Sequence, residues 1–372
     1  MKKEKEYKVF AINPGSTSTK IGLFQGDKCL FSKTVEHDAK VLQTYETLSN
    51  QLQYRRDTIM EQLKENNIDL SDVDAYVGRG GGLMAVEGGV YSVGAVLLNH
   101  ANRGANGIQH PANLGSQLAH EFGVQYGRPA YVVNPPDTDE LCDLARVTGI
   151  KGVYRHVHLH ALNLKETAIR HSVKMGKRYE ECNYIVCHIG GGISISAHQN
   201  GRMIDGTDIV GGEGPMAPNR CGSVPIIEFL RYAQGKDPKE LRALCMKTGG
   251  FVSLLGTADT KEIVRRAAEG DKAAKRAWDA LLYQIIKFIG SMATALHGKV
   301  DGILLGGGMV HNEELVQYIT DTCGWIAPVY PYPGEFELEA MAAGAIRVLK
   351  GEEQVKEYTG RPRWTGFEDE EE

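Results

Sequence analysis

The stretch AINPGSTSTKIGLF, residues 11–24, is the first copy of an internal repeat that decides the fold. The second copy is HIGGGISISA, residues 188–197, at a constant offset of 175 residues, so that Asn13 matches His188. In both copies an apolar run enters a turn that contains glycine, an alternating run leaves it, and a second turn opens a further strand. The repeat therefore predicts a three-strand meander in each half of the chain.

Helical periodicity follows the meander in both halves, with apolar residues three or four positions apart. The predicted helices are 45–66 in the first half and 226–234, 238–247, 261–269 and 273–296 in the second. Strand-rich openings that lead into helices and further strands, twice over, predict two related α/β domains with a cleft between them.

Composition narrows the classes of protein. The 372 residues exceed what one hydrophobic core organises, and a net charge of -5 with mixed signs favours neither nucleic acid nor a membrane surface. Seven cysteines without a CxxC pair, a charged start and no run of 18 apolar residues predict a soluble cytoplasmic protein. Small molecules are the expected partners.

Glycine-rich turns are suited to phosphates, because backbone N–H groups in tight turns point outward and Ser/Thr hydroxyls add donors. A polar hairpin turn is the plain alternative for NPGSTST alone, but its repetition favours phosphate binding. A third loop, GGGMVHN at residues 306–312, follows an apolar run and precedes a helical pattern, where a nucleotide could rest. No Gly-Lys-Ser/Thr follows it, so it is not a Walker A loop.

Six motifs together resemble the butyrate kinase family, within the superfamily of acetate and sugar kinases, heat-shock ATPases and actin. They are NPGSTSTKIG, GRGG, HALN, CHIGGGISISAH, GGEGPMAPNRCGSVP and YPGEFELEA, in that order. The resemblance implies two duplicated ribonuclease H-like domains, as in actin-like ATPases. We expect residues 1–183 to form the first, to which about 340–372 return, and residues 184–339 to form the second.

The resemblance also implies ATP-dependent, reversible phosphorylation of butyrate or isobutyrate to an acyl phosphate, with Mg²⁺, in a homodimer or larger homo-oligomer. Acetate or propionate is the alternative substrate, and the loop at 211–218 is the expected apolar wall beside it. A sugar kinase of the superfamily would need a general base and polar side chains to recognise hydroxyls. An actin-like or chaperone-like ATPase is the non-metabolic alternative.

The catalytic residues implied by the resemblance are Arg220, His160, Asp139 and Arg79. Arg220 and His160 match residues that contact the transferring phosphoryl group, and Arg79 could hold the substrate carboxylate as a two-donor fork. For the acid near the nucleophile, Asp137 competes with Asp139.

His160 has a second interpretation. It alternates with His156 and His158, and alternating histidines on one strand face could instead ligate a transition metal.

The implied nucleotide ligands lie in the three glycine-bearing turns. They are Asn13, Ser16, Ser18 and Lys20; His188, Gly190, Gly191 and Gly192; and Gly306, Gly307 and Gly308. For Mg²⁺ we expect Asn13 with Glu339, and Glu337 is the open alternative.

Overall fold

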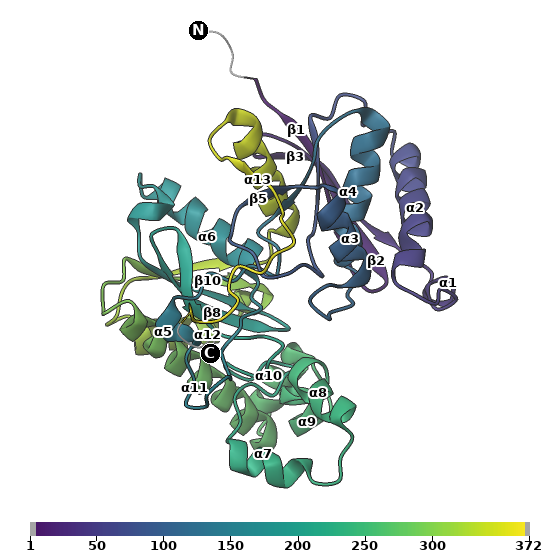
Figure 1. Ribbon diagram of the computed structural model, residues 1–372. Coiled ribbons are helices and arrows are strands. Elements are labelled where there is room, and N and C mark those ends of the chain that lie inside the picture. Colours follow the sequence, from purple (N-terminus) through teal and green to yellow (C-terminus); the bar gives the residue numbers. More distant parts are fainter. Residues whose placement is uncertain (1–4, 369–372) are drawn as a thin grey trace. The chain divides into compact units, whose positions relative to one another are not determined.

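The computed structural model describes residues 5–368 and divides into two compact units (Figure 1). The first unit runs to Thr138 and resumes at Phe336, and the second is Asp139–Glu335. The predicted domains were divided instead at 183/184 and near 340, and that division stays a prediction. Residues 1–4 and 369–372, which it includes, lie outside the described residues.

The sheet of the first unit is built on the predicted meander. Its strands are β1 (Lys8–Pro14), β2 (Ser18–Gln25), β3 (Lys28–Glu36), β4 (Ala75–Gly78), β5 (Val90–Ser92), β6 (Ala130–Val133) and β12 (Val355–Lys356). β1, β2 and β3 pair antiparallel in sequence, while β4 lies parallel to β1 and β6 parallel to β4. The order is β12-β5-β6-β4-β1-β2-β3.

The sheet of the second unit repeats this arrangement. Its strands are β7 (Tyr184–Ile189), β8 (Ile193–Gln199), β9 (Arg202–Gly206), β10 (Gly302–Gly307) and β11 (Val329–Pro333). The order β11-β10-β7-β8-β9 corresponds strand for strand to β6-β4-β1-β2-β3, with the same parallel and antiparallel pairings. The predicted duplication is therefore confirmed.

Helices cover both faces of the first sheet. They are α1 (Ala39–Leu42), α2 (Leu52–Glu65), α3 (Ala95–Arg103), α4 (Asn113–Tyr126) and α13 (Glu337–Lys350). Ile12 and Ile21 lie opposite each other on one face, where they pack with Ile59 of α2 and Leu114 of α4. α13 covers the other face, where a Cβ on Gly22 would lie 3.3 Å from Leu338.

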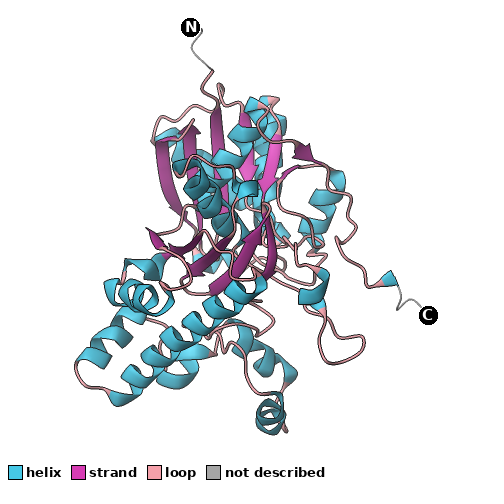
Figure 2. Cartoon of the chain, turned by 90° about the vertical axis from the view of Figure 1, so that its left-hand side faces the viewer, coloured by secondary structure: helices cyan, strands magenta, loops and turns pink. Residues whose placement is uncertain are grey.

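The second unit has the same layered construction, with an added group of helices (Figure 2). Its helices are α5 (Asp143–Arg146), α6 (Ala161–Lys174), α7 (Ile226–Ala233), α8 (Pro238–Met246), α9 (Gly250–Leu255), α10 (Thr260–Ala268), α11 (Lys272–Ala295) and α12 (Glu313–Cys323). α11 packs on β8 through a core that includes Trp278, and α6 packs on β7 and β10. No helix among residues 5–368 is both long and apolar enough to cross a membrane.

The predicted helix 45–66 starts late. The α-helix begins only at Leu52, after a short 3-10 turn over Ser49–Gln51. A hydroxyl group competes for the local backbone at the start of this segment, because Thr44 donates to the carbonyl of Val41 at 2.7 Å. Such bonds favour turns over helix.

Candidate active site

The turn between β1 and β2 carries four of the predicted nucleotide ligands. Asn13 lies directly opposite Lys20 in the strand register, so both side chains leave the same face of the sheet. Ser18 is two residues from Lys20 and shares that face, and Ser16 is exposed at the tip of the turn. The Asn13 amide donates a hydrogen bond to Oε2 of Glu337, the first residue of α13. The structure thus places Asn13, on the face that it shares with Ser18 and Lys20, beside an acid.

Arg79 faces the same acid from the end of β4. Its backbone N–H donates to the carbonyl of Ile12 at 2.9 Å, and its side chain is buried. Nη2 lies 3.7 Å from Oε1 of Glu337, while Nη1 has no hydrogen-bond partner within residues 5–368. A buried guanidinium with an unused N–H is suited to an oxygen of a bound anion.

Glu339, the predicted metal ligand, lies elsewhere. The two acids are two residues apart on one helix, so their side chains leave it in nearly opposite directions. Glu337 contacts Asn13, whereas Glu339 acts on Cys29, whose thiol pKa is raised by burial and secondly by that carboxylate. The contacts thus favour Glu337 over the predicted Glu339 as the acid beside Asn13.

Two histidines meet in the second unit. His160 lies just before α6, with Nδ1 2.8 Å from Oγ of Ser194. Its ring stacks on that of His188, with centroids 4.0 Å apart and planes 19° from parallel. Nε2 of His188 lies 3.8 Å from Oε1 of Glu335. One predicted catalytic residue and one predicted nucleotide ligand are therefore direct neighbours.

The alternative strand of metal-binding histidines is not formed. Residues 155–160 have no regular strand structure, so His156, His158 and His160 do not share a strand face. His158 instead faces Asp208, with Nδ1 3.7 Å from Oδ1. In the part of the chain that the structure describes, no three His, Cys, Asp or Glu residues are grouped as a metal site.

Arg220 lies against the second glycine turn. A Cβ on Gly192 would lie 2.7 Å from Nη1 of Arg220, so the missing side chain makes room for the guanidinium. Nη1 donates to the carbonyl of Ile209 at 2.9 Å, and the buried Nε has no hydrogen-bond partner among the described residues. Burial lowers the pKa of Arg220, and the nearby Asp208 opposes that shift.

The third glycine loop reaches the same edge of this sheet. Gly306 of β10 lies beside His188 of β7 in the parallel register. Gly307 has φ +96°, and a Cβ there would lie 2.4 Å from the carbonyl oxygen of Ile189, so this position requires glycine. Gly308 begins the 3-10 turn Gly308–His311 with open space where its Cβ would be. The second unit therefore gathers two glycine loops, two histidines and Arg220.

Comparison with known proteins decides the family. Residues 151–322 match the family model described as "Acetokinase family". A probable butyrate kinase of Clostridium botulinum is 44% identical over 354 residues, which is 95% of this chain and 99% of that protein. Butyrate kinase 1 of Clostridium acetobutylicum is 42% identical with the same coverage. The chain belongs to the acetokinase family.

Solved structures of an acetate kinase and a propionate kinase share the fold of this family member. The acetate kinase of Porphyromonas gingivalis matches with a TM-score of 0.75 at 19% identity, covering 92% of this chain and 100% of that one. A propionate kinase of Francisella tularensis matches with a TM-score of 0.70 at 18% identity, covering 91% and 98%. With the repeated strand order, these matches confirm the predicted α/β fold of two duplicated domains.

The two candidate aspartates of this family member have different partners. Both oxygens of Asp139 accept hydrogen bonds from Arg146 at 2.8 Å, in an ion pair whose side chains are 3% and 2% exposed. Asp137 is also buried and accepts a hydrogen bond from the amide of Asn106. The arginine neutralises Asp139, so its contacts explain a structural role, and its predicted catalytic role stays a prediction.

Three neighbours of the predicted site residues were missed from the sequence. Ser194 contacts His160, Glu335 lies beside His188, and Arg55 of α2 binds the carbonyl groups of the first turn. Ser194 and Glu335 stand within the motifs CHIGGGISISAH and YPGEFELEA, which offered a signal. Arg55 stands in an ordinary helical pattern, where a charged residue is expected on the surface.

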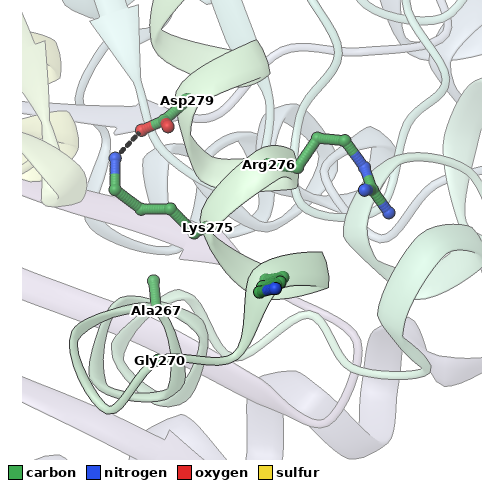
Figure 3. A pocket seen from close by; sticks show the side chains of 6 residues that line it. Ala267, Gly270, Lys275, Arg276 and Asp279 are labelled. Carbon is green, nitrogen blue, oxygen red and sulfur yellow. Dashed lines mark hydrogen bonds and ion pairs between the residues drawn. The ribbon is translucent and has the colours of Figure 1, made fainter.

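A hollow of about 480 Å³ between α10 and α11 is unrelated to these residues. It is lined by Ala267, Gly270, Lys272, Lys275, Arg276 and Asp279. In Figure 3, Lys275 pairs with Asp279 along α11 while Arg276 points away from them. None of the predicted site residues lines this hollow.

Proposed function

We propose that the chain is a butyrate kinase, which transfers the γ-phosphoryl group of ATP to butyrate or isobutyrate and gives an acyl phosphate and ADP, reversibly. The relatives that cover nearly the whole chain carry that name. The observation that carries the proposal within the structure is the guanidinium of Arg220 held against the Gly192 turn with an unused buried N–H.

The chemistry explains why cations dominate the site. A short-chain carboxylic acid has a pKa of about 4 to 5 and is already ionised at pH 7, so the nucleophile needs no strong base. The obstacle is repulsion between this anion and the anionic phosphoryl group. Arg220 and His160 are proposed to stabilise the phosphoryl group, and Arg79, with its unused Nη1, to hold the carboxylate.

The nucleotide is proposed to bind the three glycine-bearing turns. Asn13, Ser18 and Lys20 share one face of the first sheet, and His188 lies beside the second and third turns. Mg²⁺ is proposed to bind at Asn13 and Glu337, because amide and carboxylate oxygens are its preferred protein ligands and it keeps several waters. The ion would neutralise phosphate charge during transfer.

The length of the acyl chain is a finer proposal. Met216 and Ala217 of the 211–218 loop are buried in the core around α11, which supports an apolar wall. Burial of one CH₂ is worth only about 0.8 kcal/mol, or roughly fourfold in affinity, so propionate and acetate are the alternative substrates. A sugar kinase would need polar side chains here to bind hydroxyl groups.

A cytoplasmic homodimer or larger homo-oligomer is also proposed. Three apolar side chains of α7 support an interface between copies of the chain, because they are 57–68% exposed: Ile226, Ile227 and Leu230. Light scattering of the purified protein measures this directly, and a monomeric mass would contradict it.

A hydroxamate assay tests the activity. Purified protein receives Mg-ATP and hydroxylamine with acetate, propionate, butyrate, isobutyrate or glucose, and acyl hydroxamate and ADP are measured in parallel. We expect hydroxamate, strongest with the four-carbon acids. ADP with glucose and no hydroxamate would support a sugar kinase instead, and ADP without any acceptor would support an ATPase.

A further inference from the structure

Arg55 is completely buried on α2 and binds the predicted phosphate turn from behind. Its exposed fraction is 0%, and its Nη1 donates to the carbonyl of Gly15 at 2.9 Å and to that of Ser18 at 3.3 Å. Nη2 donates to the carbonyl of Ser16 at 2.9 Å. One guanidinium thus holds three carbonyl groups of a single turn.

The direction of these bonds matters for a ligand. Thr19, which alternates with Ser18 and Lys20, lies 3.4 Å from Nη1, so Arg55 approaches the face of the sheet opposite to their side chains. Because the carbonyl groups point back to Arg55, the turn can present N–H groups to the other side. The N–H groups of Ser16 and Thr17 have no acceptor within residues 5–368. This is the backbone arrangement that binds anions.

The charge of Arg55 is unusual for so buried a group. Its remaining partner is the amide oxygen of Gln51 at 3.1 Å, and no carboxylate of the described residues pairs with it. Burial lowers the pKa of Arg55 to about 10, so it stays protonated at pH 7. Burial and the charge of Arg55 lower the pKa of the neighbouring His37 to about 4, so His37 is neutral there.

A buried cation without a carboxylate partner is costly unless another anion compensates it. We infer that Arg55 is a positioning residue for the nucleotide. It fixes the turn at residues 15–18, and its positive charge behind that turn attracts the β- and γ-phosphates. The inference rests on the proposed function, since it names which residue prepares the proposed nucleotide site. The second copy of the turn is a run of glycines, Gly190–Gly192. The arginine beside that copy is Arg220, which lies against Gly192.

Calorimetric titration with AMP, ADP and Mg-ATP tests this in the full-length protein. The variants are Arg55→Gln, which removes the charge, and Arg55→Lys, which keeps it. Arg56→Gln is the matched control, because Arg56 is the next residue of α2 and pairs with Glu121, at 3.2 Å, outside the turn. Each variant is also checked for its melting temperature and for its KM for butyrate.

We expect Arg55→Gln to weaken ADP and ATP binding about tenfold or more, AMP binding less, and the KM for butyrate little. Arg55→Lys should lose less affinity for ADP and ATP than Arg55→Gln does. Arg56→Gln should bind both nucleotides as tightly as the wild type does. Unchanged ADP affinity in Arg55→Gln would overturn the inference. An equal loss for AMP, ADP, ATP and butyrate would also overturn it, because that pattern indicates general destabilisation.

Two further outcomes are decisive. If Arg55→Gln does not fold, Arg55→Lys carries the test: weaker ADP binding with an unchanged KM for butyrate supports the inference, and wild-type ADP binding overturns it. If the wild-type protein binds no nucleotide, the proposed function fails and the inference fails with it. Nucleotide binding that is insensitive to Arg55 refutes the inference alone.

Discussion

The substitution Gly192→Ala tests whether the position of Arg220 sets the rate of phosphoryl transfer. The new Cβ would lie 2.7 Å from Nη1 of Arg220, and an ordinary contact begins near 3.4 Å, so the guanidinium must move by about 0.7 Å. Gly192 is not among the glycines with positive φ, so the backbone itself should accept alanine. The fold should therefore survive while the proposed catalytic arginine is displaced.

A displacement of this size in a positioning group should lower kcat about 10- to 100-fold, with a smaller change in KM for butyrate. Steady-state hydroxamate kinetics measures both constants, and circular dichroism checks the fold. The control is a double-mutant cycle with Arg220→Lys. Lysine has the smaller head group, which avoids the collision with the new Cβ, so the effects of the two substitutions on kcat should not add. Wild-type kcat in Gly192→Ala, or strictly additive effects in the cycle, would show that the position of Arg220 does not set the rate.

Three other changes separate the roles of neighbouring residues. Asp139→Asn should lower the free energy of unfolding in urea by about 3–5 kcal/mol, because it leaves a buried arginine without its charge partner; a loss below about 1 kcal/mol would contradict the structural role. Glu337→Gln should raise the Mg²⁺ concentration for half-maximal activity about tenfold or more, and Glu339→Gln should not. Equal effects of the two substitutions would contradict the proposal that Glu337 is the Mg²⁺ ligand. Diamide should link Cys221 to Cys245, whose sulfurs are 3.9 Å apart, before other thiols, as peptide mass spectrometry can show; another first disulfide would contradict that geometry.

The meanders could be predicted from the sequence because their signals are local. The alternating runs, and the turns after them at Gly26 and Gly201, repeat at one offset, and both glycines have the positive φ that such turns need. α4 was missed because its buried face contains small and polar residues, among them Gly115 and Ser116. A Cβ on Gly115 would lie 2.3 Å from the carbonyl oxygen of Arg79, so tertiary packing, which local patterns do not encode, explains that composition.

The site was predictable where a residue stands in a motif, and less so where its position depends on packing. His160, His188 and Arg220 come from separate motifs, and the structure brings them to the same glycine turn region of one unit. The choice between Glu337 and Glu339 depends on the rotational phase of α13, whose first residue is not marked by a side-chain cap. A sequence with two acids two residues apart at a helix start therefore left that choice open.

Phosphorus NMR of a single reaction tests the central proposal most directly. The purified protein is incubated with Mg-ATP and butyrate, and the spectrum is followed as the γ-phosphate signal of ATP declines. We expect an acyl phosphate signal that grows together with ADP and disappears on addition of hydroxylamine. In the reverse direction, we expect the enzyme to form ATP from butyryl phosphate and ADP. Loss of ATP that gives only ADP and inorganic phosphate, with no acyl phosphate at any time, would contradict it.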